Sequence, residues 1–177
     1  MLIWPVIYYN YMTEEKFLFI VRHGKSTWDY GGVSDIDRPL KDRGIRDSYE
    51  MADLVLKKKV LPDTIISSPA VRALHTAIIF SRVLDFPADE IIINQDLYLA
   101  EYNEILSVIK ATDDSRKSLM IFGHNPGFSD LANYLSNLGI DNIPTAGLVL
   151  LKFNTDNWNG VSRKSLASEF FETPRNL

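Results

Sequence analysis

The sequence contains no cysteine, which removes a whole group of structural and catalytic possibilities. Disulfide bonds, thiolate metal sites and cysteine nucleophiles are excluded, and we expect a cytoplasmic protein. Basic residues are also in short supply, because 19 Lys and Arg against 23 Asp and Glu leave a net charge of −4. This balance argues against a general nucleic-acid surface, which needs a clustered basic face. Positive charge is therefore expected to matter only where it is gathered locally.

Long apolar runs are missing as well. A membrane span needs about 20 apolar residues and a secretory signal needs a basic start, and the sequence has neither pattern. With 177 residues, 46% of them hydrophobic, the chain suffices for one substantial core. We expect a single domain over residues 13–177 without a lid insertion. Residues 1–12 are expected to be an N-terminal extension: Met12 is expected to be the natural start, and the stretch before it an extension or a misassigned start. A tail that packs on the domain or on a neighbour is the alternative.

Short apolar runs alternate with segments of helical period along the rest of the chain. Helical spacing is found within 45–56, 71–78, 105–109 and 128–138, and the runs expected as strands are 17–21, 64–67, 91–93, 118–122, 148–153 and 164–171. This alternation predicts an α/β protein with three layers, α/β/α, and a mostly parallel sheet of about six strands.

Two of the expected helices have the same kind of start. Ser68 before Pro69 is expected to cap a helix, and Asn125 before Pro126 is expected to do the same. In the helix after Pro69, the buried stripe is expected to consist of Val71, Leu74 and Ile78.

Residues that suit phosphate binding stand where three of the expected strands end. Arg22 and His23 follow the first run, His124 follows the fourth, and Arg72 lies in the first turn of the helix after the second. The carboxyl ends of parallel strands meet at one edge of a sheet, so these side chains are expected to converge. Arg22-His23-Gly24 alone also fits an ordinary exit from a strand. Two guanidiniums and two imidazoles together predict a site for a tetrahedral dianion.

These residues resemble the histidine phosphatase superfamily, which has the phosphoglycerate mutase-like fold. The matching pieces are Arg22-His23-Gly24, Ser67-Ser68-Pro69 with Arg72-Ala73 and Thr76, and Gly123-His124-Asn125-Pro126. Within the superfamily, the SixA-type phosphohistidine phosphatase branch is resembled by Asp37-Arg38-Pro39-Leu40 with Gly44, and by the ending from Phe171 to Pro174.

The resemblance implies a covalent mechanism and no cofactor. His23 would be the nucleophile that attacks phosphorus, and water would hydrolyse the resulting phosphohistidine. Arg22, Arg72 and His124 would bind the phosphoryl oxygens. Nearby cations lower the pKa of an imidazole, which would keep His23 neutral and nucleophilic near neutral pH.

Further residues have both a functional and a local interpretation. The resemblance implies that Arg38 joins the phosphate ligands, and a salt bridge with Asp35 or Asp42 is the alternative. Ser26 and Thr27 would donate to the phosphoryl group, or else cap the local backbone. His75 is expected to lie on the surface or behind the site.

The substrate is predicted from what the motifs lack. Asn125, counted with the substrate-binding residues, follows His124 at a position where the acid-phosphatase branch has aspartate. Glu101 is a possible acid of the mutase type, and an exposed carboxylate at a helix start is the alternative. A missing acid matters less for an imidazole leaving group. We therefore expect protein phosphohistidine as the substrate, with a small phosphate ester as the alternative.

Two other classes are weighed against this prediction. A catalytically inert phospho-ligand-binding module on the same fold would be expected to have lost His23 or His124. A metal site built from the three histidines is not expected, because their spacing matches no usual ligand pattern. The expected protein is a monomer that binds neither nucleic acid nor membrane.

Overall fold

The computed structural model describes residues 14–29 and 31–176, so the expected extension over residues 1–12 lies outside the described residues. Its strands are β1 Glu15–Arg22, β2 Thr64–Ser67, β3 Ile92–Ile93, β4 Ser118–Gly123, β5 Leu148–Asn154 and β6 Leu166–Glu172. Its α-helices are α1 Asp42–Lys58, α2 Val71–Val83, α3 Tyr102–Lys110 and α4 Gly127–Leu135. Three 3₁₀ turns complete the described elements: η1 Ala88–Glu90, η2 Gln95–Leu97 and η3 Trp158–Gly160.

The six strands form one sheet in the order β3-β2-β4-β1-β5-β6. The pairs β3-β2, β2-β4 and β4-β1 are parallel, whereas β5 is antiparallel to both β1 and β6. The prediction of a mostly parallel sheet of about six strands is therefore confirmed in strand direction, because β5 alone among the described strands runs against the rest. The segment between β5 and β6 contains η3 and no crossover helix, so β6 returns beside β5 in the opposite direction.

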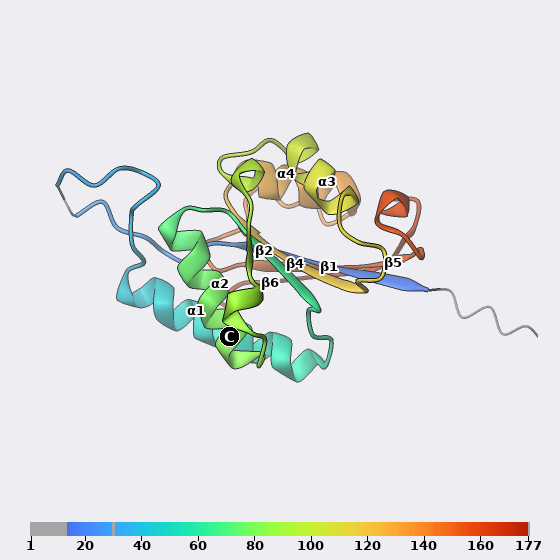
Figure 1. The fold of residues 1–177 in the computed structure, drawn as a ribbon, viewed down its shortest axis with the longest axis horizontal. Coiled ribbons are helices and arrows are strands. Elements are labelled where there is room, and N and C mark those ends of the chain that lie inside the picture. Colours follow the sequence, from blue (N-terminus) through green and yellow to red (C-terminus); the bar gives the residue numbers. More distant parts are fainter. Residues whose placement is uncertain (1–13, 30, 177) are drawn as a thin grey trace, which may run out of the picture.

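Helices cover both faces of the sheet, as the α/β/α prediction requires (Figure 1). Leu18 and Ile20 of β1 belong to the core beneath α3 and α4, and Phe19 and Val21 belong to the core beneath α1 and α2. All four side chains have no exposed surface, so the apolar run that opens the domain is buried on both faces. None of the helices in the described ranges has the length and apolar character needed to cross a bilayer.

The predicted buried stripe of α2 is wrong. Val71 is 38% exposed, and Leu74 and Ile78 are only partly buried. The face in contact with the core consists instead of Ala73, Thr76, Ala77 and Phe80. Apolar residues lie around most of this helix, so their period does not single out one face. The small side chains form the inner face, where they allow a close approach to the sheet.

The predicted helix starts are also displaced. The first helical residue of α2 is Val71 rather than Pro69, and α4 begins at Gly127 rather than Pro126. The N-cap residues are therefore Ala70 and Pro126 rather than Ser68 and Asn125. Leu138 lies beyond the end of α4 at Leu135.

Candidate active site

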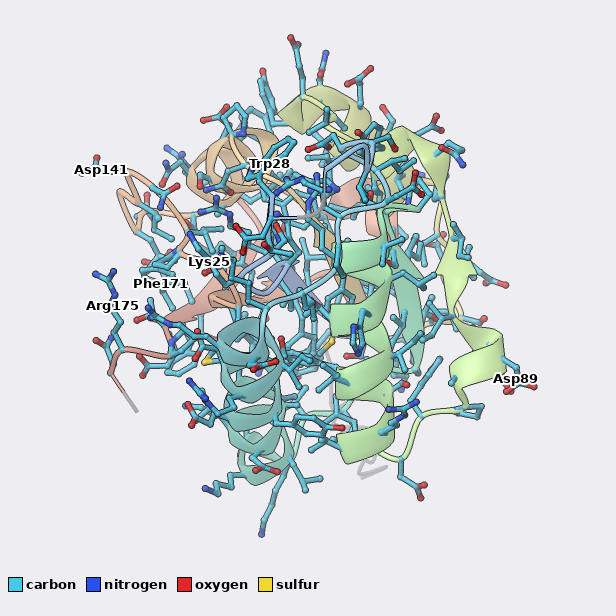
Figure 2. All side chains as sticks on the ribbon, turned by 90° about the vertical axis from the view of Figure 1, so that its left-hand side faces the viewer. Lys25, Trp28, Asp89, Asp141, Phe171 and Arg175 are labelled. Atoms are coloured by element: carbon cyan, nitrogen blue, oxygen red, sulfur yellow. The ribbon has the colours of Figure 1, made fainter. Side chains whose placement is uncertain are left out.

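The register of the sheet places two histidines side by side. In the parallel pair β1-β4, Arg22 lies opposite Gly123, so the next residues, His23 and His124, leave neighbouring strands at the same level. Their ring centroids are 5.1 Å apart. Figure 2 looks onto this face of the molecule, where the loop after β1 carries the labelled Lys25 and Trp28.

Arg72 lies between the two imidazoles. Its Nε is 3.3 Å from Nε2 of His23, and one terminal nitrogen is 3.3 Å from Nδ1 of His124. The Arg72 side chain is 2% exposed, so a formal positive charge is held in the interior against two rings. The first turn of α2 thus brings Arg72 to the two strand ends, as predicted from the order of motifs.

The hydrogen bonds of each ring define its tautomer. Nδ1 of His23 is 2.7 Å from the carbonyl oxygen of Gly24, which only accepts, so Nδ1 carries the proton. Its Nε2 therefore has a lone pair that faces Arg72. In His124 the lone pair is on Nδ1, where Arg72 donates, and the protonated Nε2 donates to the Ser68 hydroxyl over 2.8 Å. The Ser68 oxygen also accepts from the backbone N–H of Ala70, over 3.4 Å.

Burial keeps both rings neutral. Burial lowers the pKa of His23 to about 3; the carbonyl of Gly24 opposes this shift, and the positive charges of Arg72, Arg22 and Arg38 reinforce it. Burial likewise lowers the pKa of His124 to about 3, with further contributions from His23 and Arg72. An unprotonated Nε2 on His23 is thus available at neutral pH, as a nucleophile requires.

Asp35 organises the arginines of the site, a role the sequence did not reveal. Its Oδ2 accepts from Arg72 at 2.9 Å and from the hydroxyl of Tyr98 at 2.8 Å, while its Oδ1 accepts from Arg38 at 3.0 Å. Partial burial acts to raise the pKa of Asp35, but the hydrogen bonds from Tyr98 and Arg72 and the charges of Arg72 and Arg38 outweigh it and lower the pKa to about 2. Asp35 is therefore ionised at neutral pH.

Tyr98 is the second residue that sequence reasoning missed. Its ring meets His124 edge-on, with centroids 5.6 Å apart, and its hydroxyl reaches Asp35. It stands in an irregular segment just after η2, where no period or motif marks it. The only sequence signal for Asp35 is its place three residues before Arg38, which suggested a salt bridge and nothing more.

Arg22 and Asn125 meet at the segment before β5. Arg22 donates to the carbonyl of Ile143 at 2.6 Å, and the amide of Asn125 donates to the same carbonyl at 3.1 Å and to Asn142 at 2.8 Å. Asn125 thus ties two loops together instead of capping α4. The buried Nε of Arg22 and Oδ1 of Asn125 have no hydrogen-bond partner among the described residues.

The remaining residues proposed from sequence lie at the rim. Arg38 forms the salt bridge with Asp35 rather than Asp42, and it also donates to Ser26 at 2.9 Å. Thr27 makes local bonds with Asp29, in accord with the capping interpretation.

Two further candidates form no described hydrogen bond with the imidazoles. Glu101 is exposed just before α3, where its backbone N–H donates to Glu104. His75 is half-buried on α2, and its described contacts do not include the site.

Comparisons with known proteins agree with this geometry. The family model of the histidine phosphatase superfamily, branch 1, matches residues 18–105. An uncharacterized chloroplastic protein of Arabidopsis thaliana is 30% identical over 151 residues, covering 80% of this chain and 68% of the relative.

Solved structures support the same assignment. A protein of Agrobacterium tumefaciens assigned as the phosphohistidine phosphatase SixA is 29% identical with a TM-score of 0.69, over 77% of this chain and 90% of that one. A protein histidine phosphatase SixA complexed with tungstate has the same fold, with a TM-score of 0.75 at 22% identity over 90% of this chain and 98% of that one. The chain belongs to the histidine phosphatase superfamily, in its SixA-type branch.

Proposed function

We propose that this protein is a phosphatase that transfers a phosphoryl group to Nε2 of His23 and then to water, and that its preferred substrate is phosphohistidine on a protein. The observation that carries the proposal is the tautomer of His23. The carbonyl of Gly24 fixes the proton on Nδ1 and leaves the lone pair of Nε2 beside the Arg72 guanidinium. A phosphoryl group bound by Arg72 would therefore lie next to that lone pair.

In the first step, the Nε2–P bond forms as the bond from phosphorus to the leaving group breaks. The arriving oxygens would take over the Arg72 N–H groups that now contact the two rings. Arg22, whose positive charge acts on His23, would add to the attraction for the phosphoryl oxygens. In the second step, water attacks the phosphohistidine, Nε2 leaves with its electron pair, and inorganic phosphate is released. Donors placed in this way stabilise the charge that builds up on the phosphoryl oxygens.

Phosphohistidine is favoured as the substrate because none of the described carboxyl groups at the site is placed to act as a general acid. Asp35 is ionised, with a pKa of about 2, and its oxygens already accept from three donors, so it has no proton to give. Glu101 is exposed at the start of α3, and no carboxyl group in the described ranges hydrogen-bonds to either imidazole. An alkoxide leaving group needs an acid, whereas a departing imidazole is readily protonated by solvent. A small phosphomonoester is the alternative substrate.

The mechanism is tested by trapping the intermediate. The protein is mixed with a ³²P-labelled phosphohistidine peptide, quenched within milliseconds and analysed for phosphate that is labile to acid and stable to base. We expect label on His23 in the wild type, no label in His23→Ala, and normal labelling in His75→Ala, which removes the histidine outside the site. Turnover that survives in His23→Ala would overturn the covalent mechanism.

The substrate is tested separately. The ratio kcat/KM is measured for the phosphohistidine peptide, for the matching phosphoserine peptide and for p-nitrophenyl phosphate. We expect the phosphohistidine peptide to be the best of the three by about tenfold or more. If p-nitrophenyl phosphate is turned over faster and His23 is labelled normally, the covalent mechanism stands and the proposal of phosphohistidine as the preferred substrate is wrong.

A further inference from the structure

The edge of the sheet formed by β3 is open. The described sheet neighbour of β3 is β2, through Ile66 and Ile92, and on its other side no described strand follows. Ile92 is 51% exposed and Ile93 is 54% exposed, which is unusual for the apolar residues of a strand. An exposed edge with apolar side chains is a template for another extended segment.

A groove of about 740 Å³ runs beside this edge, between β2-β3 and α3. Its apolar floor includes Ile66, Ile92, Val108 and Phe86. Its volume falls within the range of about 300–1,000 Å³ that is usual for ligand sites, so it has room for several side chains of a bound segment. Figure 2 labels Asp89, in the turn before β3, at the edge of the molecule opposite Phe171 and Arg175.

The rim of the groove is strongly acidic. Five carboxylates line it against a single guanidinium, that of Arg116: Asp63, Glu90, Asp96, Glu104 and Asp113. The groove therefore carries four excess negative charges, and these equal the net charge of −4 of the whole chain. Charges elsewhere in the chain balance. None of the five carboxylates takes part in a salt bridge within residues 14–29 and 31–176.

The charge of the groove selects its occupant. A second copy of this chain would bring two acidic rims together, and like charges across an interface oppose association. A segment with lysine or arginine at alternate positions would instead place its cations in the groove, with their aliphatic stems over the apolar floor and their charges at the rim. Its other side chains would lie on the opposite face of the sheet, beside the exposed Ile93, because side chains of an extended strand alternate between two faces.

We propose that this groove, lined by β3 and α3, is a docking surface for an extended basic segment of a partner protein. The segment adds to the sheet at β3 through its backbone, and its cations pair with Glu90, Asp96 and the other carboxylates of the rim. The surface is distinct from the catalytic pocket. The groove and the catalytic pocket are nevertheless close along the chain. Asp96 lines the groove and stands two residues before Tyr98, whose hydroxyl binds Asp35.

The test uses the whole chain and a fluorescein-labelled nonapeptide in which lysine and valine alternate. Binding is followed by fluorescence anisotropy at about 50 and about 300 mM salt, which separates long-range attraction from contact. The groove variant is Glu90→Lys with Asp96→Lys, both exposed. The matched control is Glu50→Lys with Asp53→Lys, which makes the same change in net charge on exposed positions of α1. Thermal unfolding checks that both variants are folded.

We expect the groove variant to weaken binding by about tenfold, at either salt concentration, and the control by less than about twofold. Pairing with the sheet is tested with two N-methylated peptides, one methylated on the valine amides and one on the lysine amides. One of the two should lose binding, because only one edge of the peptide faces β3. A control nonapeptide in which glutamate replaces every lysine should not bind.

Three results would overturn the proposal. Equal weakening by both double variants would mean that the peptide responds only to the net charge of the chain. Full binding by both N-methylated peptides would exclude addition to the sheet. Dimers that form in the wild type and dissociate in the groove variant, measured by analytical ultracentrifugation, would make a second copy the occupant instead.

Discussion

Replacing Asp35 by asparagine removes the carboxylate that binds Arg72 and Arg38. Three donors converge on Asp35, from Arg72, Arg38 and Tyr98. An amide has a single acceptor oxygen and an NH₂ group that only donates. In Asp35→Asn, at least one of the three donors must therefore face another donor. Arg72 keeps its bond to the backbone carbonyl of Asp35 but loses its ionic partner, so we expect its side chain to be held less firmly between the two imidazoles while the fold is retained.

The magnitude is estimated from the bonds that are lost. A hydrogen bond to a charged group contributes about 1.5–3 kcal/mol, and the lower end applies because the Asp35 side chain is 34% exposed. A loss of about 1.5 kcal/mol in the transition state corresponds to roughly a tenfold fall in kcat. Binding of the anionic substrate in the ground state is expected to be unchanged or tighter, because a negative charge beside the pocket has been removed.

The assay measures kcat and KM separately with p-nitrophenyl phosphate or a phosphohistidine peptide. Asp37→Asn is the matched control, since it removes the same charge from the same loop, where Asp37 bonds only Ser34 among the described contacts. We expect a fall in kcat without a rise in KM for Asp35→Asn, and normal values for the control. If kcat stays within twofold of the wild type, or KM rises alone, Asp35 does not position Arg72.

Two further predictions concern stability. The pKa values of His23 and His124 are lowered from 6.5 to about 3, so between these limits the unfolded chain binds more protons than the folded one and the free energy of unfolding falls as the pH falls. Between pH 6.5 and 5, urea unfolding should show that the free energy of unfolding falls by up to about 2 kcal/mol per histidine. In His124→Gln, the part of this pH dependence that is due to His124 should disappear. An unchanged pH dependence in this variant would show that His124 is not held neutral in the folded protein. In Gly44→Ala, the added Cβ would lie 2.6 Å from the backbone nitrogen of Lys25, and this clash should exceed the gain in helix propensity. We expect the melting temperature to fall by about 2–8 °C in Gly44→Ala and to stay unchanged in Gly31→Ala, whose Cβ would meet no atom within 4 Å; equal melting temperatures would contradict the packing argument.

The parts of the site that follow strands could be predicted from sequence. The apolar runs before His23 and His124 are unbroken. The two strands are buried and pair in parallel, residue by residue, up to Arg22 and Gly123. Once two such strands are adjacent, the residues after them must be neighbours. Arg72 could be placed for the same reason, because β2 pairs with β4 and α2 follows β2 within a few residues.

The parts that depend on loop packing could not be predicted. Asp35 and Tyr98 are 63 positions apart, and both stand in segments without a period. Ser68 illustrates the same limit, since its local context predicts a helix cap and its tertiary partner is His124. The prediction of the buried face of α2 was wrong because the helix has apolar residues on several sides. Only the packed structure shows which of them face the sheet.

The charge balance of the pocket explains why its histidines are neutral. Arg22, Arg38 and Arg72 stand against the single carboxylate of Asp35, which leaves two positive charges for a phosphoryl dianion to neutralise. Protonating either ring before the substrate arrives would add a third positive charge in a site where His23 and His124 are 7% and 3% exposed. Burial and the arginines both oppose that charge. The same arrangement that attracts the anion therefore keeps the lone pair of His23 free to attack it.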